Sequence, residues 1–270
     1  EDGRAYQQDK KNQPIMIEYF NIPSGALINT PISKKLFAEK APLSAGEKRL
    51  LREEIEKLTM KGLLQTRTIG LAAYMDDEQA YDQIIIAEVS IKNPTKAMPV
   101  ATMVQKAFPA PMFLVIHYEG SYCVNWCVKR INQADKTRRV MEEQQITRFF
   151  VPEGDDYIAN AWLPSLNITH IRCNSLKELF DQLSAKLLLL KVADEAGCFT
   201  GLNVSEPDLV YYRSVLEALN ANRAEQQDIK KQLRGETQFN RIVKLKSKLR
   251  ELQDQEQKRK VQLIEKRNGQ

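Results

Sequence analysis

The sequence predicts an α/β (α+β) mixed-sheet core domain followed by a C-terminal antiparallel helical hairpin or coiled coil. As far as about residue 200, helical patterns alternate with short apolar segments, which is typical of a sheet covered by helices. Beyond residue 205, apolar positions recur only at helical steps of three and four. We therefore predict an N-terminal extension (1–19), a core domain (20–200) and a helical hairpin (205–270).

The strongest apolar segment of the chain predicts a β-hairpin at the centre of the sheet. Residues 112–116 are continuously apolar, as in a strand that is covered on both faces. The dipeptide Glu119-Gly120 marks a tight turn. Residues 122–129 alternate in part, which indicates a second strand. This strand runs directly into the polar segment 129–135.

The remaining elements of the core follow from capping and periodicity. Ser44 and Glu47 form a capping box, and the apolar stripe behind them predicts a helix that ends at Gly62. A second capping box, Ser175 with Glu178, begins a helix that ends near Gly197. Between them we predict strands at 65–73, 82–92 and 169–173, and helices at 101–108 and 136–150.

The last quarter of the chain predicts two long amphipathic helices. Ser205 and Pro207 carry the signals of a helix start, and the first helix runs to about Leu233. Residues 235–237 are the turn signal before the second helix, whose leucines recur at steps of three and four. Two such helices joined by a short turn predict an antiparallel hairpin.

The positive charge of the chain is concentrated in the second of these helices. Residues 241–270 hold ten Lys/Arg and four Asp/Glu, a balance of +6 within a total of +5. This helix either contacts the DNA backbone or forms the solvated face of a hairpin that docks on a protein partner, and its interrupting acidic residues favour docking. The candidate contact residues are Lys244, Lys246, Lys248, Arg250, Lys258, Arg259 and Lys260.

Cysteine usage and hydropathy predict a cytoplasmic protein. Cys123, Cys127, Cys173 and Cys198 form no C-x-x-C pair, so we expect reduced thiols and no zinc site. No run approaches the roughly 20 apolar residues that cross a bilayer, and the N-terminus lacks a signal-peptide pattern. We expect no metal, no cofactor and no membrane contact.

One pattern points to a different class, a metal-dependent nuclease. In nucleases with an E-x-K strand, carboxylates hold Mg²⁺ and a lysine positions the attacking water. The candidates are Asp82, Glu88 and Lys92, but their spacing is E-x-x-x-K and Ser90 stands where lysine is required. The alternative is an exposed Glu/Lys pair at the end of a strand. A Mg²⁺ cofactor is expected only if the nuclease hypothesis holds.

The segment K-R-I-N-Q-A-D is the more specific signal. Lys129 and Arg130 have the chemistry to bind a phosphate or a carboxylate, and are otherwise solvated edge charges. Asn132 and Asp135 either fix the turn after them or cap a helix that begins at Lys136. The sequence leaves the functional and the structural interpretation equally open.

This segment also carries a family resemblance, together with F-N-I-P at 20–23, I-S-K-K-L-F at 32–37, I-I-A-E-V at 85–89 and P-x-P-x-x-L-V at 109–115. Across about 20–190 the chain resembles an uncharacterised bacterial domain-of-unknown-function family. The family is typically encoded beside DNA methyltransferases and superfamily 2 helicases, SNF2-type ones included, in restriction and anti-phage defence loci. It assigns no tested role to Lys129, Arg130, Asn132 or Asp135.

The resemblance implies an accessory protein of a DNA modification or restriction system. Joined to the amphipathic tail and the incomplete catalytic pattern, it predicts a non-catalytic subunit that docks on a helicase or methyltransferase through the C-terminal helices. A nuclease, or direct DNA binding by the basic helix, is the alternative.

Overall fold

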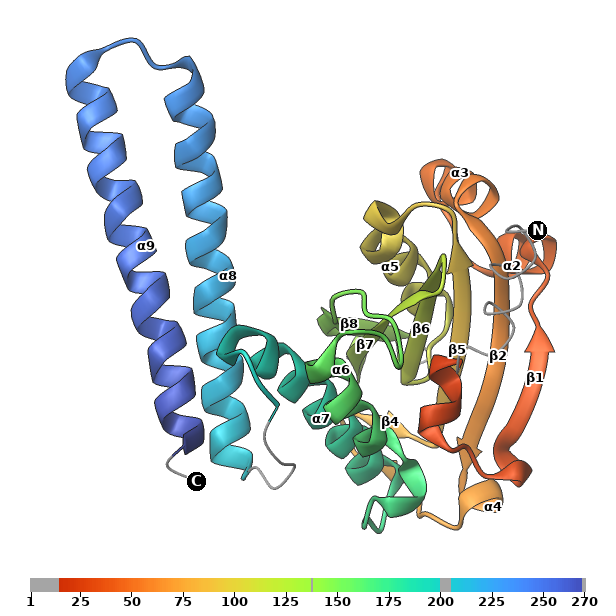
Figure 1. Ribbon diagram of the computed structural model, residues 1–270. Helices are drawn as coiled ribbons and strands as arrows, with labels where there is room; N and C mark the ends of the chain where they lie inside the picture. Colours follow the sequence, from red (N-terminus) through yellow and green to blue (C-terminus); the bar gives the residue numbers. More distant parts are fainter. Residues whose placement is uncertain (1–14, 137, 200–204, 269–270) are drawn as a thin grey trace, which may run out of the picture. The chain divides into compact units, whose positions relative to one another are not determined.

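A computed structural model describes residues 15–136, 138–199 and 205–268, and the chain divides into two compact units between Leu187 and Leu188 (Figure 1). The division falls inside helix α7 (Leu176–Ala196), ahead of the predicted start of the hairpin at residue 205. Residues 1–14 of the predicted N-terminal extension lie outside the described residues. We describe each unit by itself.

The first unit is built on a six-stranded sheet in the order β1-β2-β5-β6-β7-β8. The central pair, β5 and β6, is parallel and every other neighbouring pair is antiparallel, which confirms the predicted mixed sheet. The strands are β1 (Leu27–Pro31), β2 (Ile55–Gln65), β5 (Gln83–Ile91), β6 (Met112–Tyr118), β7 (Ser121–Ile131) and β8 (Arg139–Ile146). Strands β3 (Tyr74–Met75) and β4 (Ala80–Tyr81) pair separately.

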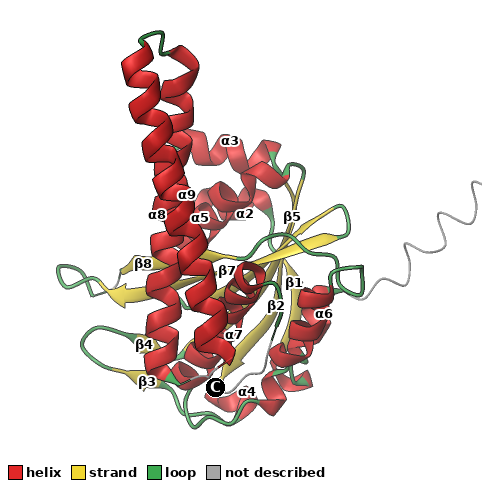
Figure 2. Cartoon of the chain, turned by 60° about the vertical axis from the view of Figure 1, so that its left-hand side comes forward, coloured by secondary structure: helices red, strands yellow, loops and turns green. Residues whose placement is uncertain are grey.

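Helices cover both faces of this sheet, as the red and yellow elements of Figure 2 show. Helices α2 (Lys34–Lys40), α3 (Ala45–Glu53) and α5 (Ala97–Ala107) pack on one face, where alternate residues of β5 and β6 such as Val89 and Leu114 are fully buried. We call this the α5 face. Burial of such side chains contributes about 1.5–3 kcal/mol each.

The opposite face is covered by the 3₁₀ helix η2 (Met16–Phe20) and the first part of α7. Their aromatic side chains meet the sheet at Phe113, whose ring centroid lies 6.4 Å from Phe20 and 4.8 Å from Phe180. The remaining short elements are η3 (Ser24–Ala26), α4 (Thr66–Ile69), η4 (Pro94–Lys96), α6 (Tyr157–Trp162), η5 (Leu163–Leu166) and η6 (Ile168–His170).

The predicted central hairpin is confirmed. Strands β6 and β7 are joined at Glu119 and Gly120, which have positive φ angles of 45° and 81°. Two consecutive residues with positive φ define the two-residue turn whose twist matches that of the flanking strands. The backbone N–H of Gly120 donates to Nε2 of His117, 3.1 Å away, and this bond closes the turn.

The helix predicted from Ser44 to Gly62 is too long. The capping box of Ser44 and Glu47 is present, but helix α3 ends at Glu53 and strand β2 begins at Ile55. Leu58 therefore belongs to the strand rather than to the helical stripe. A ladder with β5, which runs from Ile55 to Gln65 with two register shifts, holds the segment extended, so pairing overrides its local helical pattern. The strand predicted at 65–73 was also wrong, since Gln65 is the last residue of β2 and the short helix α4 follows it, ended by Gly70.

Two further predictions were wrong. The segment 136–150, expected to be helical, contains edge strand β8, which pairs with β7 from Asn125 to Ile131. The strand expected at 169–173 is instead irregular after the 3₁₀ helix η6. In both segments the number of apolar residues is too small for their period to decide between helix and strand.

The second unit contains the end of α7 and the two helices α8 (Glu206–Gly235) and α9 (Phe239–Asn268). Figures 1 and 2 both show α8 and α9 side by side, which confirms the predicted antiparallel hairpin. Ser205 caps α8 by accepting a hydrogen bond from the backbone N–H of Asp208. No helix among the described residues is long and apolar enough to cross a membrane.

The tight turn of the central hairpin provides a test of the fold. Replacing Gly120 by Ala should lower the free energy of unfolding by about 1–2 kcal/mol, because a side chain at positive φ is strained. Replacing Glu119 by Asn should raise it, because Asn adopts this conformation at lower cost. Urea unfolding followed by the fluorescence of Trp126 and Trp162 measures both. Equal effects of the two substitutions would contradict this turn.

Candidate functional site

The three candidate nuclease residues are not brought together. Glu88 lies in the middle of β5, Asp82 directly precedes the strand and Lys92 directly follows it. At about 3.3 Å per residue, Asp82 lies about 20 Å and Lys92 about 13 Å from Glu88 along the chain. The cation beside Glu88 is instead Lys61 of β2, at 3.7 Å. No group of three or more His, Cys, Asp or Glu in the described segments has a geometry that could hold a metal ion.

His117 lies near Glu88, and both of its ring nitrogens and its ring face make contacts with neighbouring residues. Its Nε2 accepts the N–H of Gly120, so in the neutral ring the proton is on Nδ1, which lies 3.5 Å from Oγ of Ser90. The ring stacks on Tyr122 with 4.8 Å between centroids, and burial raises the pKa of that phenol. These contacts fix the end of the hairpin, and hold the imidazole in a structural role.

Lys129 of the K-R-I-N-Q-A-D segment is buried, with only 4% of its surface exposed. Its ammonium donates to three backbone carbonyl oxygens, those of Gln105 at 2.9 Å, Phe108 at 2.6 Å and Ala110 at 2.9 Å. These carbonyls lie at and just beyond the C-terminal end of α5, where a helix leaves acceptors unpaired and favours positive charge. Lys129 is therefore neither an exposed phosphate ligand nor a solvated edge charge, the two roles considered from the sequence.

Burial lowers the pKa of Lys129 to about 8. The three carbonyl oxygens use all three N–H donors of the protonated ammonium, which offsets part of the cost of removing the charge from water. The lysine thus ties the end of α5 to β7 through one side chain.

The other residues of the segment build the connection between β7 and β8. Arg130 points to the opposite face of the sheet from Lys129 and pairs with Glu142 of β8 at 2.7 Å. Oδ1 of Asn132 accepts the backbone N–H groups of Ala134 and Asp135 at 2.9 and 3.2 Å. The carboxylate of Asp135 pairs with Nε of Arg138 at 3.1 Å. Of the two roles expected for Asn132 and Asp135, the turn is observed, and strand β8 stands where the capped helix was expected.

A pocket of about 570 Å³ lies between the end of α5 and strand β8, and we call it the α5–β8 pocket. Lys106 and Phe108 line it on the α5 side, and Arg139 and Met141 line it on the β8 side. Lys129 lies at its base, between these two walls. Sequence reasoning singled out Lys129 but missed Lys106, Arg138 and Arg139, because the segment after Asp135 was expected to be helical.

The cysteines offer no reactive thiol on the described part of the sheet. All four are free, and Cys123 and Cys127 are fully buried. Burial raises the pKa of the Cys127 thiol to about 11 and raises that of Cys123 further. A thiol that stays protonated is a poor nucleophile, so these two side chains act as small apolar groups.

The candidate basic residues of α9 divide into three groups. Lys248 pairs with Glu225 of α8, and Lys260 lies 3.7 Å from Glu195 and 3.5 Å from Glu256. Arg259 is half-buried. The other four, Lys244, Lys246, Arg250 and Lys258, are exposed, and no ion pair among the described residues involves them.

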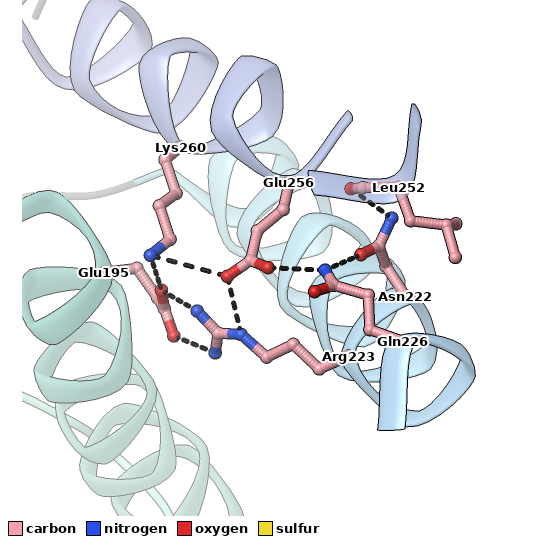
Figure 3. A network of polar contacts seen from close by, with 7 residues as sticks. All are labelled: Glu195, Asn222, Arg223, Gln226, Leu252, Glu256 and Lys260. Carbon is pink, nitrogen blue, oxygen red and sulfur yellow. Dashed lines mark hydrogen bonds and ion pairs between the residues drawn. The ribbon is translucent and has the colours of Figure 1, made fainter. Parts of the chain in front are cut away.

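A polar network joins the last turn of α7 to α8 and α9 (Figure 3). Arg223 donates to both oxygens of Glu195 at 2.6 and 2.7 Å, and its Nε donates to Glu256 at 2.9 Å. The carboxylates raise the pKa of this guanidinium. Beside it, the amide of Asn222 donates to the carbonyl oxygen of Leu252 at 3.1 Å. The network fixes the register of three helices, and the sequence offered no signal for it.

The pKa of Lys129 leads to a measurable pH dependence. In the unfolded chain a lysine titrates near 10.4, so between about pH 8 and pH 10.4 the unfolded state binds more protons than the folded state. The free energy of unfolding of the wild type, relative to that of Lys129→Met, should therefore rise by up to about 3 kcal/mol over this interval. Urea unfolding at several pH values measures the difference.

Lys106→Met is the matched control, because Lys106 is an exposed lysine of α5, the helix whose end Lys129 contacts. Its stability should follow that of the wild type across the same pH range. A constant difference between the wild type and Lys129→Met would show that Lys129 keeps an ordinary pKa.

The Arg223 network predicts a difference between two ion pairs of the hairpin. Arg223→Met should destabilise the helical unit by about 1–3 kcal/mol, because it removes the closest partner that Glu195 and Glu256 share and leaves them only Lys260, at 3.7 and 3.5 Å. Lys248→Met removes an exposed pair and should cost less than about 1 kcal/mol. Urea unfolding followed by circular dichroism at the helical band compares them. Equal costs would show that the network contributes no more than a surface pair.

Comparison with known proteins gives a family but no activity. No curated protein and no solved structure matches the chain. A protein-family match covers residues 20–255, and so includes the sheet, the polar segment and most of the helical hairpin. The chain belongs to the family described as a domain of unknown function (DUF4391).

Proposed function

We propose that the protein is a non-catalytic accessory subunit of a DNA restriction–modification or anti-phage defence complex. Its C-terminal hairpin docks on a helicase or a methyltransferase of that complex. The observation that carries the docking proposal is the outer part of the hairpin, described residues 231–251, none of which is buried. The defence setting rests on the family resemblance of the core segments.

The outer part of the hairpin exposes apolar surface that two helices alone do not cover. Each helix has 30 residues and is therefore about 45 Å long. Near the turn, Phe239 is 76% exposed and Val243 is 49% exposed. Exposed large apolar side chains that lie close together mark protein interaction sites more often than isolated ones do. A groove on a partner protein would cover them.

The net charge of this region indicates what charge the partner surface carries. Residues 241–250 hold five Lys/Arg and no Asp/Glu, a net charge of +5. Two of these basic residues pair with acidic residues of the hairpin, Arg241 with Glu236 and Lys248 with Glu225. The partner surface is therefore acidic at its edge and apolar at its centre, which is the usual anatomy of a protein interface.

The non-catalytic part of the proposal is supported by the positions and the hydrogen bonds of the candidate residues. Glu88 is separated from Asp82 and Lys92 along one strand. Lys129 and Asn132 are held by backbone groups. Lys129 and Asn132 therefore already serve the fold, and the nuclease candidates do not converge on one site.

Direct DNA binding is a second candidate function. It is favoured by four exposed cations of the outer hairpin that have no ion pair among the described residues, Arg234, Lys244, Lys246 and Arg250. DNA binding by these residues would weaken with salt, by a slope of about −0.9 for each phosphate contacted. Protein docking through Phe239 and Val243 would depend less on salt.

The docking proposal predicts that Phe239→Glu/Val243→Glu weakens binding to the neighbouring helicase or methyltransferase at least tenfold, because the new charges cannot be buried. Biolayer interferometry with the full chain and each purified partner measures this. The matched control is Val210→Glu/Val261→Glu, two exposed apolar residues of α8 and α9 away from the turn. Point variants are preferred to deletion of the tail, because Leu188 and Val192 of α7 pack on α8.

Equal binding by both variants would exclude the outer hairpin as the docking surface. The charge variant Lys244→Glu/Lys246→Glu/Arg250→Glu separates the two candidates. DNA binding replaces docking if two results are obtained together. The wild type binds duplex DNA and the charge variant does not, and neither protein binds the helicase or the methyltransferase.

A further inference from the structure

We propose that the α5–β8 pocket binds a phosphate monoester that carries an apolar or aromatic body. This site is independent of the docking function proposed for the hairpin. Three features support it: the charge of the pocket walls, the arrangement of the arginines and the apolar side chains between them.

The charge of the pocket matches a dianion. Four cations line it, Lys106, Lys129, Arg138 and Arg139. Two carboxylates pair with them, Glu47 with Lys106 at 3.3 Å and Asp135 with Arg138 at 3.1 Å. The remaining formal charge is +2. A phosphate monoester carries a charge of about −1.5 to −2 at neutral pH, whereas a single carboxylate carries −1.

Lys129 contributes a positive electrostatic potential to the α5–β8 pocket, and it has no hydrogen bond left to donate to a ligand. Its three N–H donors are used by carbonyl oxygens, and no ion pair among the described residues involves it. A charge that lacks a counter-ion and is shielded from water acts more strongly on its surroundings than an exposed one. The pocket therefore has a positive potential at its base before any ligand enters.

Arg138 and Arg139 are held in place by the turn that Asn132 and Asp135 build. The backbone N–H of Arg138 donates to the carbonyl oxygen of Asp135 at 2.9 Å, and its own carbonyl accepts from Asn132 at 3.1 Å. Nη1 of Arg139 donates to the carbonyls of Lys136 and Arg138 at 3.0 and 3.2 Å. The Nε and Nη2 groups of Arg139 form the planar fork that binds two phosphate oxygens at once.

The space between the cations is apolar. Phe108 and Pro109 come from the end of α5, and Val140 and Met141 come from β8. A volume of about 570 Å³ lies within the range of small-ligand sites. Gln105 also lines the pocket, and its buried Oε1 has no hydrogen-bond partner in the described part of the chain. Its amide nitrogen donates to the carbonyl oxygen of Met112 and to Oδ1 of Asn125, so Gln105 belongs to the buried wall of the pocket.

Titration of the full chain with phenyl phosphate tests the site. Isothermal calorimetry should show saturable binding of one equivalent, and inorganic phosphate should bind more weakly because it lacks the apolar body. Arg138→Gln/Arg139→Gln should weaken the binding of phenyl phosphate at least tenfold. Both arginines lie in or beside an exposed connection, so this variant should fold, and its circular dichroism spectrum checks that it does.

The matched control is Arg241→Gln/Arg250→Gln, which removes the same charge from the hairpin and should bind phenyl phosphate like the wild type. An equal loss in the two variants, or no binding of phenyl phosphate at millimolar concentration, would overturn the proposal.

Two further probes distinguish the sources of the phosphate ester. Adenosine monophosphate represents a free nucleotide, and a 5′-phosphorylated tetranucleotide represents the end of a nucleic acid. Tighter binding of either probe that depends on Arg138 and Arg139 supports the site and assigns its source. Binding of the tetranucleotide that persists without its 5′-phosphate, and in Arg138→Gln/Arg139→Gln, counts against the pocket.

Discussion

The contact between the ammonium of Lys129 and three carbonyl oxygens is the constraint on which the α5 side of the sheet depends. Helix α5 ends at Ala107, and the chain returns directly to β6 through Phe108 and Ala110. The carbonyls of this return would otherwise be buried without donors, at a cost of about 1–3 kcal/mol each. Lys129 supplies all three donors from β7. The side chain of Lys129 thereby fixes the position at which α5 ends. It also holds strand β7 against that end of the helix.

In the helical unit, too, one cationic side chain holds several elements together, but here its partners are carboxylates instead of backbone carbonyls. Its apolar core, which includes Tyr212, Leu219 and Leu263, lies near the start of α8 and the end of α9. Arg223 and its two carboxylates extend this packing by about one further turn of α8. Beyond Ile229 the helices have little to bury. A hairpin that is anchored at its base and has no buried residue among 231–251 leaves its far end available to a partner.

The sequence predicted those elements whose signals are local and failed where pairing decides. The hairpin at Glu119-Gly120, the cap at Ser44 and the two final helices each follow from residues within one turn or strand. Strands β2 and β8 are held extended by pairing with β5 and β7, and their own residues do not show it. The site followed the same rule. Lys129 was singled out by its segment, but Lys106 and Arg139 reach the α5–β8 pocket only through the fold.

The most recognisable segment of the chain therefore has to be interpreted as architecture before it is interpreted as chemistry. Lys129, Asn132 and Asp135 hold backbone groups or a neighbouring arginine, so a search for catalytic residues among them would select side chains that are already occupied. Their effect is to position Arg138 and Arg139 at the pocket. These two arginines keep donors that the fold does not use, and they stand beside a buried charge that the fold leaves without a counter-ion. Any ligand chemistry of the sheet unit is accordingly expected at these two arginines, a few residues after the segment that the sequence makes conspicuous.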